Sequence, residues 1–405
     1  MPEFYFARQP ILDRAKSVFG YELLFRDSSQ NAYAAANGES ATLDILSNAL
    51  FHTSLKRMVA GKRGLVNFTR ELLLSDVIFL FPPEEIVIEV LEDIVPDDRI
   101  VAACRRLKEA KYKIALDDFV ANQLDHPLIP LADFIKVDFL QTKPGERRLI
   151  ANRLLPHKVA LLAEKVETYD DFREGHALGY HLFQGYFFSK PVIQSGLRLA
   201  PSQVSCVRLL QAVFNEQCDL GELNRIISGD ISLTYKMLKL ANSPYFGFRT
   251  EITSIIHAIT LLGYAGMKRF VSLVAISASL GNKPAELALT CLARARMAEG
   301  IAPLIGLAAS APTFFLAGLF SLLNALLDCS MADAIAELPI AKELKSALLG
   351  EPNIYRQTLD AILAYERGNW EQFRKGAAEI KLPENSFSEI YASSIEWASD
   401  VFHSM

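Results

Sequence analysis

Oxygen-bearing side chains recur where short apolar runs end in the first half of this sequence. The residues that share this position are Asn67, Glu89, Glu92, Asp117, Asp118, Asp138, Glu164, Glu167 and Gln184. Carboxylate and amide oxygens are the ligands that Mg²⁺ and Mn²⁺ prefer, whereas Zn²⁺ favours nitrogen and sulfur. So many acids at one place would repel one another unless cations compensated them. The pattern therefore predicts a site for hard divalent cations.

The adjacent pair Asp117-Asp118 also suits two cations. Neighbouring carboxylates can serve two metal ions about 3.5–4 Å apart, and such ions activate water and stabilise the leaving oxygen in phosphodiester cleavage. Each acid taken alone is better explained as a helix N-cap or a solvated turn residue. Because polar residues follow several of the apolar runs in the same way, the set as a whole favours a binding or catalytic site.

Eight apolar runs must position these side chains. Read as strands, they span residues 3–10, 17–25, 64–68, 85–91, 113–116, 133–137, 158–163 and 181–187. Amphipathic segments such as 97–110 and 146–155 lie between most of them, and strands that alternate with helices predict a parallel sheet with crossover helices. Residues 11–16 are too short a link for a crossover helix, so the first two strands should form an antiparallel hairpin.

The simplest closure of this sheet is a (β/α)8 barrel with one antiparallel strand. A doubly wound open sheet remains the alternative. In a barrel, the carboxyl ends of the strands form the active-site face, so the polar residues would converge in one mouth. The fold class predicted for the first half is therefore α/β, with a TIM-like barrel.

Six short motifs in the first half follow one another in a characteristic order. They are Glu22-Leu23-Leu24-Phe25-Arg26, Val66-Asn67-Phe68-Thr69, Glu89-Val90-Leu91-Glu92, Asp117-Asp118-Phe119, Lys136-Val137-Asp138 and Gln184-Gly185-Tyr186. Together they resemble the EAL family of cyclic di-GMP phosphodiesterases, over about residues 3–195. The resemblance implies that cyclic di-GMP is the ligand and that two Mg²⁺ or Mn²⁺ ions support its hydrolysis to linear pGpG.

The resemblance also implies a role for each matching residue. The residues implied to bind metal ions are Glu22, Asn67, Glu89, Asp117, Asp118 and Glu164, with Asp117 shared between the two ions. The residues implied to be catalytic are Glu164, Lys136 and Glu22. Of these, Glu164 is the general base, and Lys136 holds the attacking water or a phosphate oxygen. The residues implied to contact the cyclic di-GMP ligand are Arg26, Gln184 and Asp138.

Two segments depart from the family pattern. The family continues Asp-Asp-Phe with Gly-Thr-Gly-Tyr-Ser-Ser, whereas this chain has Val120-Ala121-Asn122 and neither glycine. The family's Ala-Glu-Gly-Val-Glu is Ala163-Glu164-Lys165-Val166-Glu167 here. Two hypotheses therefore stand: a metal-dependent cyclic di-GMP phosphodiesterase, and a catalytically inactive receptor or scaffold that acts through ligand or protein binding. The family's glycine loop is coupled to dimerisation, so a homodimer is also left open.

Strand patterns give way to helical ones after about residue 200, which predicts an all-α second half. The segments 230–233, 240–247 and 258–263 resemble the HDOD domain, a modified relative of the HD-GYP phosphohydrolases. That resemblance implies a module for contacts with an unidentified protein partner. Ser321-Leu322 replaces the His-Asp metal pair of the catalytic relatives, so no hydrolase is expected here. The predicted domains are residues 1–195, an EAL-type barrel, and residues 196–405, an all-helical HDOD domain.

The composition is that of a globular protein, with 51% hydrophobic and 22% charged residues. A formal net charge of -5 argues against a nucleic-acid partner, which would require a basic face. Five widely spaced cysteines without a CxxC pair predict reduced thiols and a cytoplasmic location. Residues 300–327 carry no charge and are long enough to be considered as a membrane span, but Pro303 and Pro312 interrupt them. We therefore expect buried helices there and no contact with a membrane.

Overall fold

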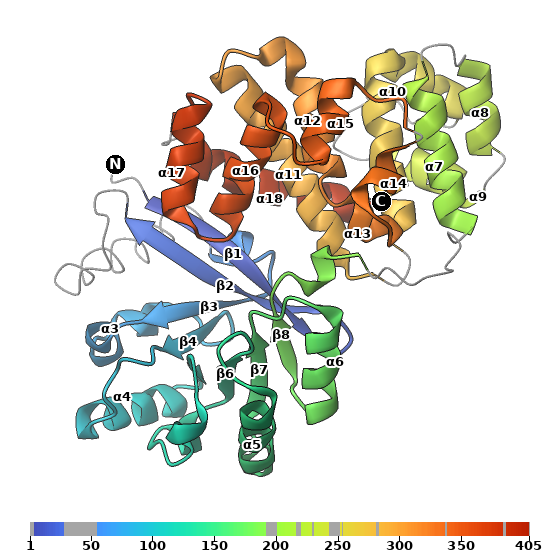
Figure 1. Cartoon of the computed structure of the whole chain (residues 1–405). Coiled ribbons are helices and arrows are strands. Elements are labelled where there is room, and N and C mark those ends of the chain that lie inside the picture. Colours follow the sequence, from blue (N-terminus) through green and yellow to red (C-terminus); the bar gives the residue numbers. More distant parts are fainter. Residues whose placement is uncertain are drawn as a thin grey trace. The chain divides into compact units, whose positions relative to one another are not determined.

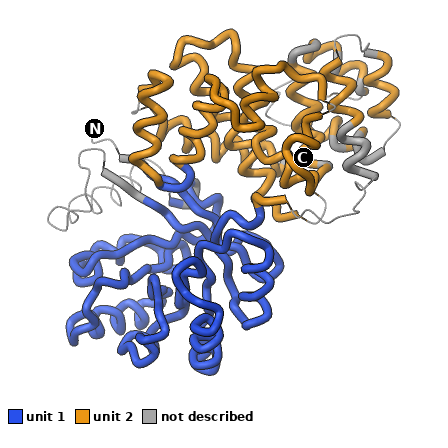
Figure 2. Tube along the Cα trace, in the orientation of Figure 1, with its two compact units in different colours: residues 1–188, 366–368 blue, residues 189–365, 369–405 orange. Residues whose placement is uncertain are grey.

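The computed structural model describes residues 4–27, 55–191, 201–215, 220–228, 231–242, 252, 254–280, 283–336, 338–383 and 386–404. The chain forms two compact units. One comprises residues 1–188 with 366–368, and the other comprises residues 189–365 with 369–405 (Figure 2). The predicted domain boundary, between residues 195 and 196, lies outside the described residues.

The first unit is built on a closed barrel of eight strands that neighbour one another in chain order (Figure 1). The strands are β1 (Phe4–Asp13), β2 (Val18–Asp27), β3 (Arg63–Phe68), β4 (Ile86–Val90), β5 (Lys113–Leu116), β6 (Phe134–Asp138), β7 (Ala160–Glu164) and β8 (Leu182–Gln184). β1 is antiparallel to both β2 and β8, and the other neighbours are parallel. The predicted barrel with one antiparallel strand is confirmed, and the open-sheet alternative is wrong.

Helices cover the outside of the barrel and begin at residues that cap them. They are α2 (Leu55–Met58), α3 (Arg70–Leu74), α4 (Asp98–Glu109), α5 (Pro144–Leu154) and α6 (Tyr169–Leu178). The Asp97 carboxylate accepts a hydrogen bond from the Ile100 amide at the start of α4. Thr168 and Asp171 cap the start of α6 reciprocally. Side-chain acceptors at these positions satisfy amides that have no partner within the helix.

The interior of the barrel holds one apolar layer. Its buried members come from seven strands and are Ile11, Leu65, Val87, Ala115, Phe134, Leu162 and Leu182. Side chains alternate between the two faces of a strand, so the residue two positions further along points to the same side. From β3 to β8 those next residues are Asn67, Glu89, Asp117, Lys136, Glu164 and Gln184. The alternation thus places a polar layer directly above the apolar one, at the carboxyl end of the barrel.

The second unit is helical. Its helices, as far as the chain is described, are α7 (Pro201–Phe214), α8 (Leu220–Ser228), α9 (Ile231–Ala241), α10 (Ile255–Ser279), α11 (Ala285–Leu304), α12 (Ala311–Phe320), α13 (Leu323–Leu327), α14 (Met331–Ala336), α15 (Lys342–Leu348), α16 (Ile354–Glu366), α17 (Trp370–Glu379) and α18 (Phe387–Ser404). The prediction of an all-α second half is confirmed.

The uncharged run 300–327 lies in α11, α12 and α13, where residues such as Phe314 and Leu326 are fully buried. Among the described helices, none is sufficiently long and apolar to cross a membrane. The run therefore belongs to the core of the helical unit, as expected from its interrupting prolines.

Candidate functional site

A buried lysine lies at the centre of the polar layer. The Lys136 side chain is only 1% exposed, and its Nζ lies 2.8 Å from Glu164 Oε1, 2.9 Å from Asp117 Oδ1 and 3.6 Å from Glu22 Oε1. It also contacts Glu89 Oε1. One ammonium group from β6 thus meets four carboxylates, which come from β2, β4, the end of β5 and β7.

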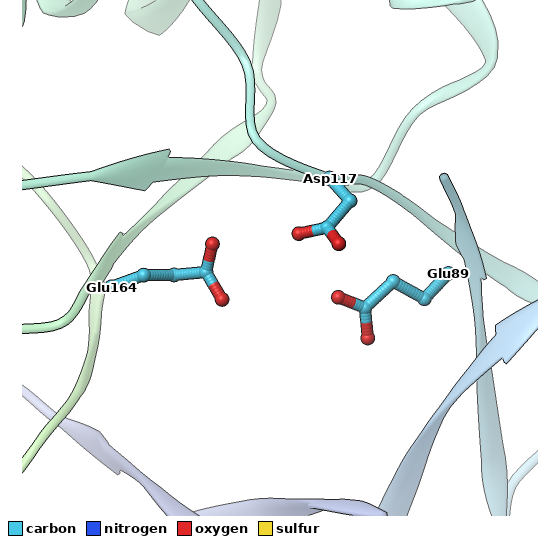
Figure 3. Close-up of side chains that lie close together, drawn as sticks. All are labelled: Glu89, Asp117 and Glu164. Carbon is cyan, nitrogen blue, oxygen red and sulfur yellow. The ribbon is translucent and has the colours of Figure 1, made fainter. Parts of the chain in front are cut away.

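Three of these carboxylates are close enough to share one cation. Glu89, Asp117 and Glu164 each offer an oxygen, and these oxygens lie within 4.8 Å of one another. Figure 3 shows the three carboxylates turned toward a common space. Asn67 is paired in register with Glu89 on the neighbouring strand. The cluster therefore contains the oxygen ligands that Mg²⁺ and Mn²⁺ prefer.

Two buried oxygens of this cluster lack a hydrogen-bond partner among the described residues. They are Asn67 Oδ1 and Glu89 Oε2. A buried acceptor without a partner costs about 1–3 kcal/mol. Carboxylate and amide oxygens of this kind are ligands for a divalent cation, so the residues present fit a metal ion.

Three carboxyl groups at this site, those of Asp117, Asp118 and Glu164, have raised pKa values. Burial, together with the nearby Glu164 and Glu22 carboxylates, raises the pKa of Asp117 to about 9. Burial also raises the pKa of Glu164, although the Lys136 ammonium opposes this effect. Burial likewise raises the pKa of Asp118, against the opposing charge of Lys165. A bound cation would reverse these shifts because it favours the ionised carboxylates.

Gln184, at the end of β8, fixes one of the acids. Its Nε2 donates a hydrogen bond to Glu22 Oε2 and another, 3.0 Å long, to Gln9 Oε1 on β1. Gln9 was not expected from the sequence. The available signal was its position two residues before Ile11 on the antiparallel strand, which places it above the apolar layer.

Asp138, which was expected to contact the ligand, has protein partners on both oxygens. Its Oδ1 accepts hydrogen bonds from the Leu140 amide at 2.6 Å and the Gln141 amide at 3.0 Å. Its Oδ2 contacts the Lys165 ammonium. Asp138 therefore organises the turn after β6 and holds Lys165 beside Glu164.

Lys165 has the backbone conformation of a glycine. Its φ is +52°, in the left-handed region that glycine adopts without steric cost. This is the position at which the EAL pattern has glycine, so the conformation of the loop is kept although the residue differs. Burial alone would lower the pKa of Lys165, but the contact with Asp138 and the charge of Asp118 outweigh that effect and raise it.

The loop after β5 does not require the two glycines of the family pattern. Val120 is extended, with a φ of -120°, and Asn122 lies in a short 3-10 helix, Ala121–Gln123. The positive φ of this segment, +39°, is at Asp118, whose amide donates a 3.0 Å hydrogen bond to Asp117 Oδ1. The loop is therefore organised by different residues.

Two residues singled out from the sequence, Glu92 and Glu167, lie outside the buried cluster. Glu92 and Glu167 are exposed, so only one of the two acids at each of these strand ends belongs to the polar layer. The side chain of Arg26 lies outside the described part of the structure, and so does its predicted contact with the ligand.

In the helical unit, an arginine contacts Ser321, the first residue of the pair expected to replace the His-Asp metal ligands. Arg294 Nη1 donates a 3.3 Å hydrogen bond to Ser321 Oγ, which itself donates to the Gly318 carbonyl at 2.7 Å. Arg294 is 3% exposed. Within the described part of this unit, no three His, Cys, Asp or Glu side chains lie close enough together to hold one ion.

Comparisons with protein families find a different domain in each half of the chain. The EAL domain model matches residues 2–191, and the HDOD domain model matches residues 199–347. The uncharacterized protein YuxH of Bacillus subtilis (strain 168) is 35% identical to this chain over 98% of both sequences. The cyclic di-GMP phosphodiesterase CdgJ of Vibrio cholerae is 30% identical, and the match covers 98% of this chain and 93% of that protein.

Among solved structures, the chain resembles EAL proteins over a little under half of its own length. BlrP1 of Klebsiella pneumoniae, in a complex with calcium and cyclic di-GMP, is 25% identical, with a TM-score of 0.40, over 46% of this chain and 55% of that one. The YkuI protein of Bacillus subtilis is 20% identical over the same shares, with a TM-score of 0.39. The two domain models and the two full-length relatives lead to one conclusion: the chain belongs to the family of proteins in which an EAL domain is followed by an HDOD domain.

Proposed function

We propose that the barrel binds cyclic di-GMP with a divalent cation and hydrolyses it to linear pGpG. The cation would be held by the metal cluster, defined as Glu22, Asn67, Glu89, Asp117 and Glu164. The observation that carries the proposal is the convergence of four carboxylates from separate strands on the buried Lys136 ammonium. The Vibrio cholerae relative, which matches along nearly its whole length, is named as a cyclic di-GMP phosphodiesterase and supports the same reading.

The ligand set favours Mg²⁺ or Mn²⁺ because every donor is a carboxylate or amide oxygen. A second ion would share Asp117 and lie near Asp118 and Glu164. When bound, such ions stabilise negative charge on the phosphate and lower the pKa of water.

Lys136 and Glu164 supply the remaining functions. The Lys136 ammonium is held by carboxylates on several sides, so it is oriented to donate a hydrogen bond to a phosphate oxygen or to the attacking water. Glu164 would accept a proton from that water. The hydroxide formed adds to phosphorus, the bond from phosphorus to the ribose 3′ oxygen breaks, and the leaving oxygen takes up a proton, which yields pGpG.

A receptor that binds cyclic di-GMP without turnover is the second candidate. The observation that favours it is Lys165, which places a cation beside Glu164 and is held there by Asp138. A fixed positive charge at this point competes with a second metal ion. The altered loop at residues 120–123 favours the same candidate.

Incubation of the purified chain with cyclic di-GMP and Mg²⁺ or Mn²⁺, followed by chromatography of the nucleotides, tests the proposal. We expect pGpG to form and Glu22→Gln to reduce its rate at least about 100-fold. Glu109→Gln changes an exposed acid on α4 and serves as the matched control, with an unchanged rate. Binding without turnover would establish the receptor, and the absence of binding would contradict both candidates.

We further propose, from the HDOD match alone, that the helical unit contacts a protein partner. A second copy of this chain, which would form a homodimer, is one such partner. Sedimentation of the purified chain over a range of concentrations tests it, and a monomer at all concentrations would exclude the homodimer.

A further inference from the structure

The helical unit contains a cavity of about 1550 Å³. Its wall is formed by residues of α7, α10, α11, α12, α15 and α18, together with the segment before α15. Sites for small ligands usually measure about 300–1,000 Å³. The cavity therefore has room for a molecule of nucleotide size, and it is separate from the metal cluster of the barrel.

The charges around this cavity have one sign. Four basic residues line it: Lys268, Arg269, Arg296 and Lys342. Among the described residues of the wall, none is acidic. The four cations come from three different helices, so their proximity results from the tertiary structure and not from one basic helix face.

One acid behind the wall orients two of these cations. The carboxylate of Glu299 contacts Arg269 through Oε1 and lies 2.7 Å from Arg296 Nη1 through Oε2. Its side chain is 13% exposed. The same carboxylate therefore holds two guanidinium groups of the wall in place.

Aromatic rings form the apolar part of the same wall. Phe315 and Trp397 meet edge to face, with centroids 6.1 Å apart. The Arg269 guanidinium lies over the Phe315 ring at 4.5 Å, and the Lys268 ammonium lies over the Phe214 ring at 5.5 Å. These cation–π contacts hold positive groups against the aromatic wall. Rings and cations side by side match a ligand that has an aromatic ring and an anionic group.

We propose that this cavity binds a small anion that carries an aromatic ring, of the nucleotide class. The ring would pack against Trp397, and the phosphate would lie among Arg296, Lys342 and Lys268. The site is independent of the function proposed for the barrel, since it shares no residue with the metal cluster.

Trp397 makes the site observable in the full-length chain. The chain has two tryptophans, and the other, Trp370, lies on α17 against Tyr365, at 5.1 Å between ring centroids. Trp370→Phe therefore leaves Trp397 as the single tryptophan. GTP, guanosine and inorganic phosphate serve as probes that carry ring and charge, ring alone and charge alone. The titrations are made in EDTA, which keeps divalent cations from the barrel.

We expect GTP to quench Trp397 fluorescence saturably and to bind at least about tenfold more tightly than guanosine or phosphate. Lys342→Glu and Arg296→Gln, each introduced into the Trp370→Phe chain, should weaken GTP binding at least about tenfold. Lys375→Glu reverses an exposed charge on α17, away from the cavity, and should leave it unchanged. Circular dichroism of each variant verifies the helical fold. The proposal is overturned if GTP does not quench saturably, if guanosine binds equally well, or if the cavity variants bind GTP as the control does.

Discussion

Lys136 is the residue around which the polar layer of the barrel is organised. Removing one partner from a buried ionic group leaves charges without compensation, which costs about 3–5 kcal/mol. The contacts of Lys136 with Asp117 and Glu164, at 2.9 and 2.8 Å, make it the main compensating charge while no metal ion is bound. In the metal-free protein, Lys136 therefore has a structural role.

Lys136→Met should lower the free energy of unfolding of the metal-free protein by about 3 kcal/mol, because the carboxylates lose their shared cation. Mn²⁺ should restore part of the loss by replacing that charge. Urea denaturation with and without Mn²⁺ measures both effects. Lys143→Met, at an exposed position before α5, is the control. A variant that is as stable as the control without metal would contradict this role.

Lys165→Gly should tighten Mn²⁺ binding by about tenfold, since it removes a positive charge that acts on Asp118 and Glu164. Its positive φ of +52° suits glycine, so the backbone should not rearrange. Calorimetric titration with Mn²⁺ measures the affinity and the number of ions bound. Lys158→Gly reproduces the backbone change at φ +61° away from the metal cluster, and should leave the affinity unchanged. Equal effects of the two substitutions would show that the charge of Lys165 is irrelevant.

At the scale of elements, the site depends on how β8 meets the segment after β7. Gly185 follows β8 with a φ of +144°, and a Cβ there would lie 2.2 Å from the Val166 carbonyl oxygen. Two backbone hydrogen bonds, from Val166 to Gln184 and from Phe187 to Val166, hold the segments together. The close approach fixes the segment that carries Glu164 and Lys165.

Gly185→Ala should reduce the free energy of unfolding by about 2–3 kcal/mol, because the methyl group overlaps backbone atoms that cannot move freely. It should also weaken Mn²⁺ binding, since Val166 shifts together with Glu164. Urea denaturation and calorimetric titration measure the two effects. Gly145→Ala, at a position on α5 where a Cβ meets no atom within 4 Å, should be neutral or slightly stabilising. A neutral Gly185→Ala would contradict the argument from close approach.

At the scale of the whole molecule, the net charge of -5 is not evenly distributed. The barrel gathers acids in its metal cluster, where burial raises the pKa of Asp117 from 3.8 to about 9. The cavity of the helical unit gathers basic residues instead. Acidic residues are therefore concentrated in the polar layer of the barrel, and basic residues in the wall of the helical cavity.

The stability of the metal-free protein should fall as the pH rises from about 4 to about 9. Asp117 binds its proton more tightly in the folded chain than in the unfolded chain, so the free energy of unfolding decreases as the proton is withdrawn. Mn²⁺ should reduce this loss because it stabilises the ionised carboxylate. Urea denaturation at several pH values, with EDTA or Mn²⁺, measures the difference. Asp117→Asn should flatten the dependence in EDTA, and an unchanged slope in that variant would contradict the assignment.

The amino-acid sequence by itself determined the order of the strands and the residues that β3 to β8 contribute to the polar layer. The physical reason is local: side chains alternate along a strand, so an acid two residues after an apolar core position must face the barrel interior. Glu89 after Val87 and Glu164 after Leu162 follow this rule. The rule also explains why Glu92, beyond the end of its strand, is exposed and lies outside the polar layer.

Only the tertiary structure decided which partners these residues have. Gln9 reaches Gln184 because the barrel closes between its first and last strands, and Asp138 meets Lys165 because two loops come together. The basic and aromatic wall of the helical cavity likewise combines residues up to about 180 positions apart, such as Phe214 and Trp397. Such contacts depend on packing between distant segments, which no periodicity within one segment encodes.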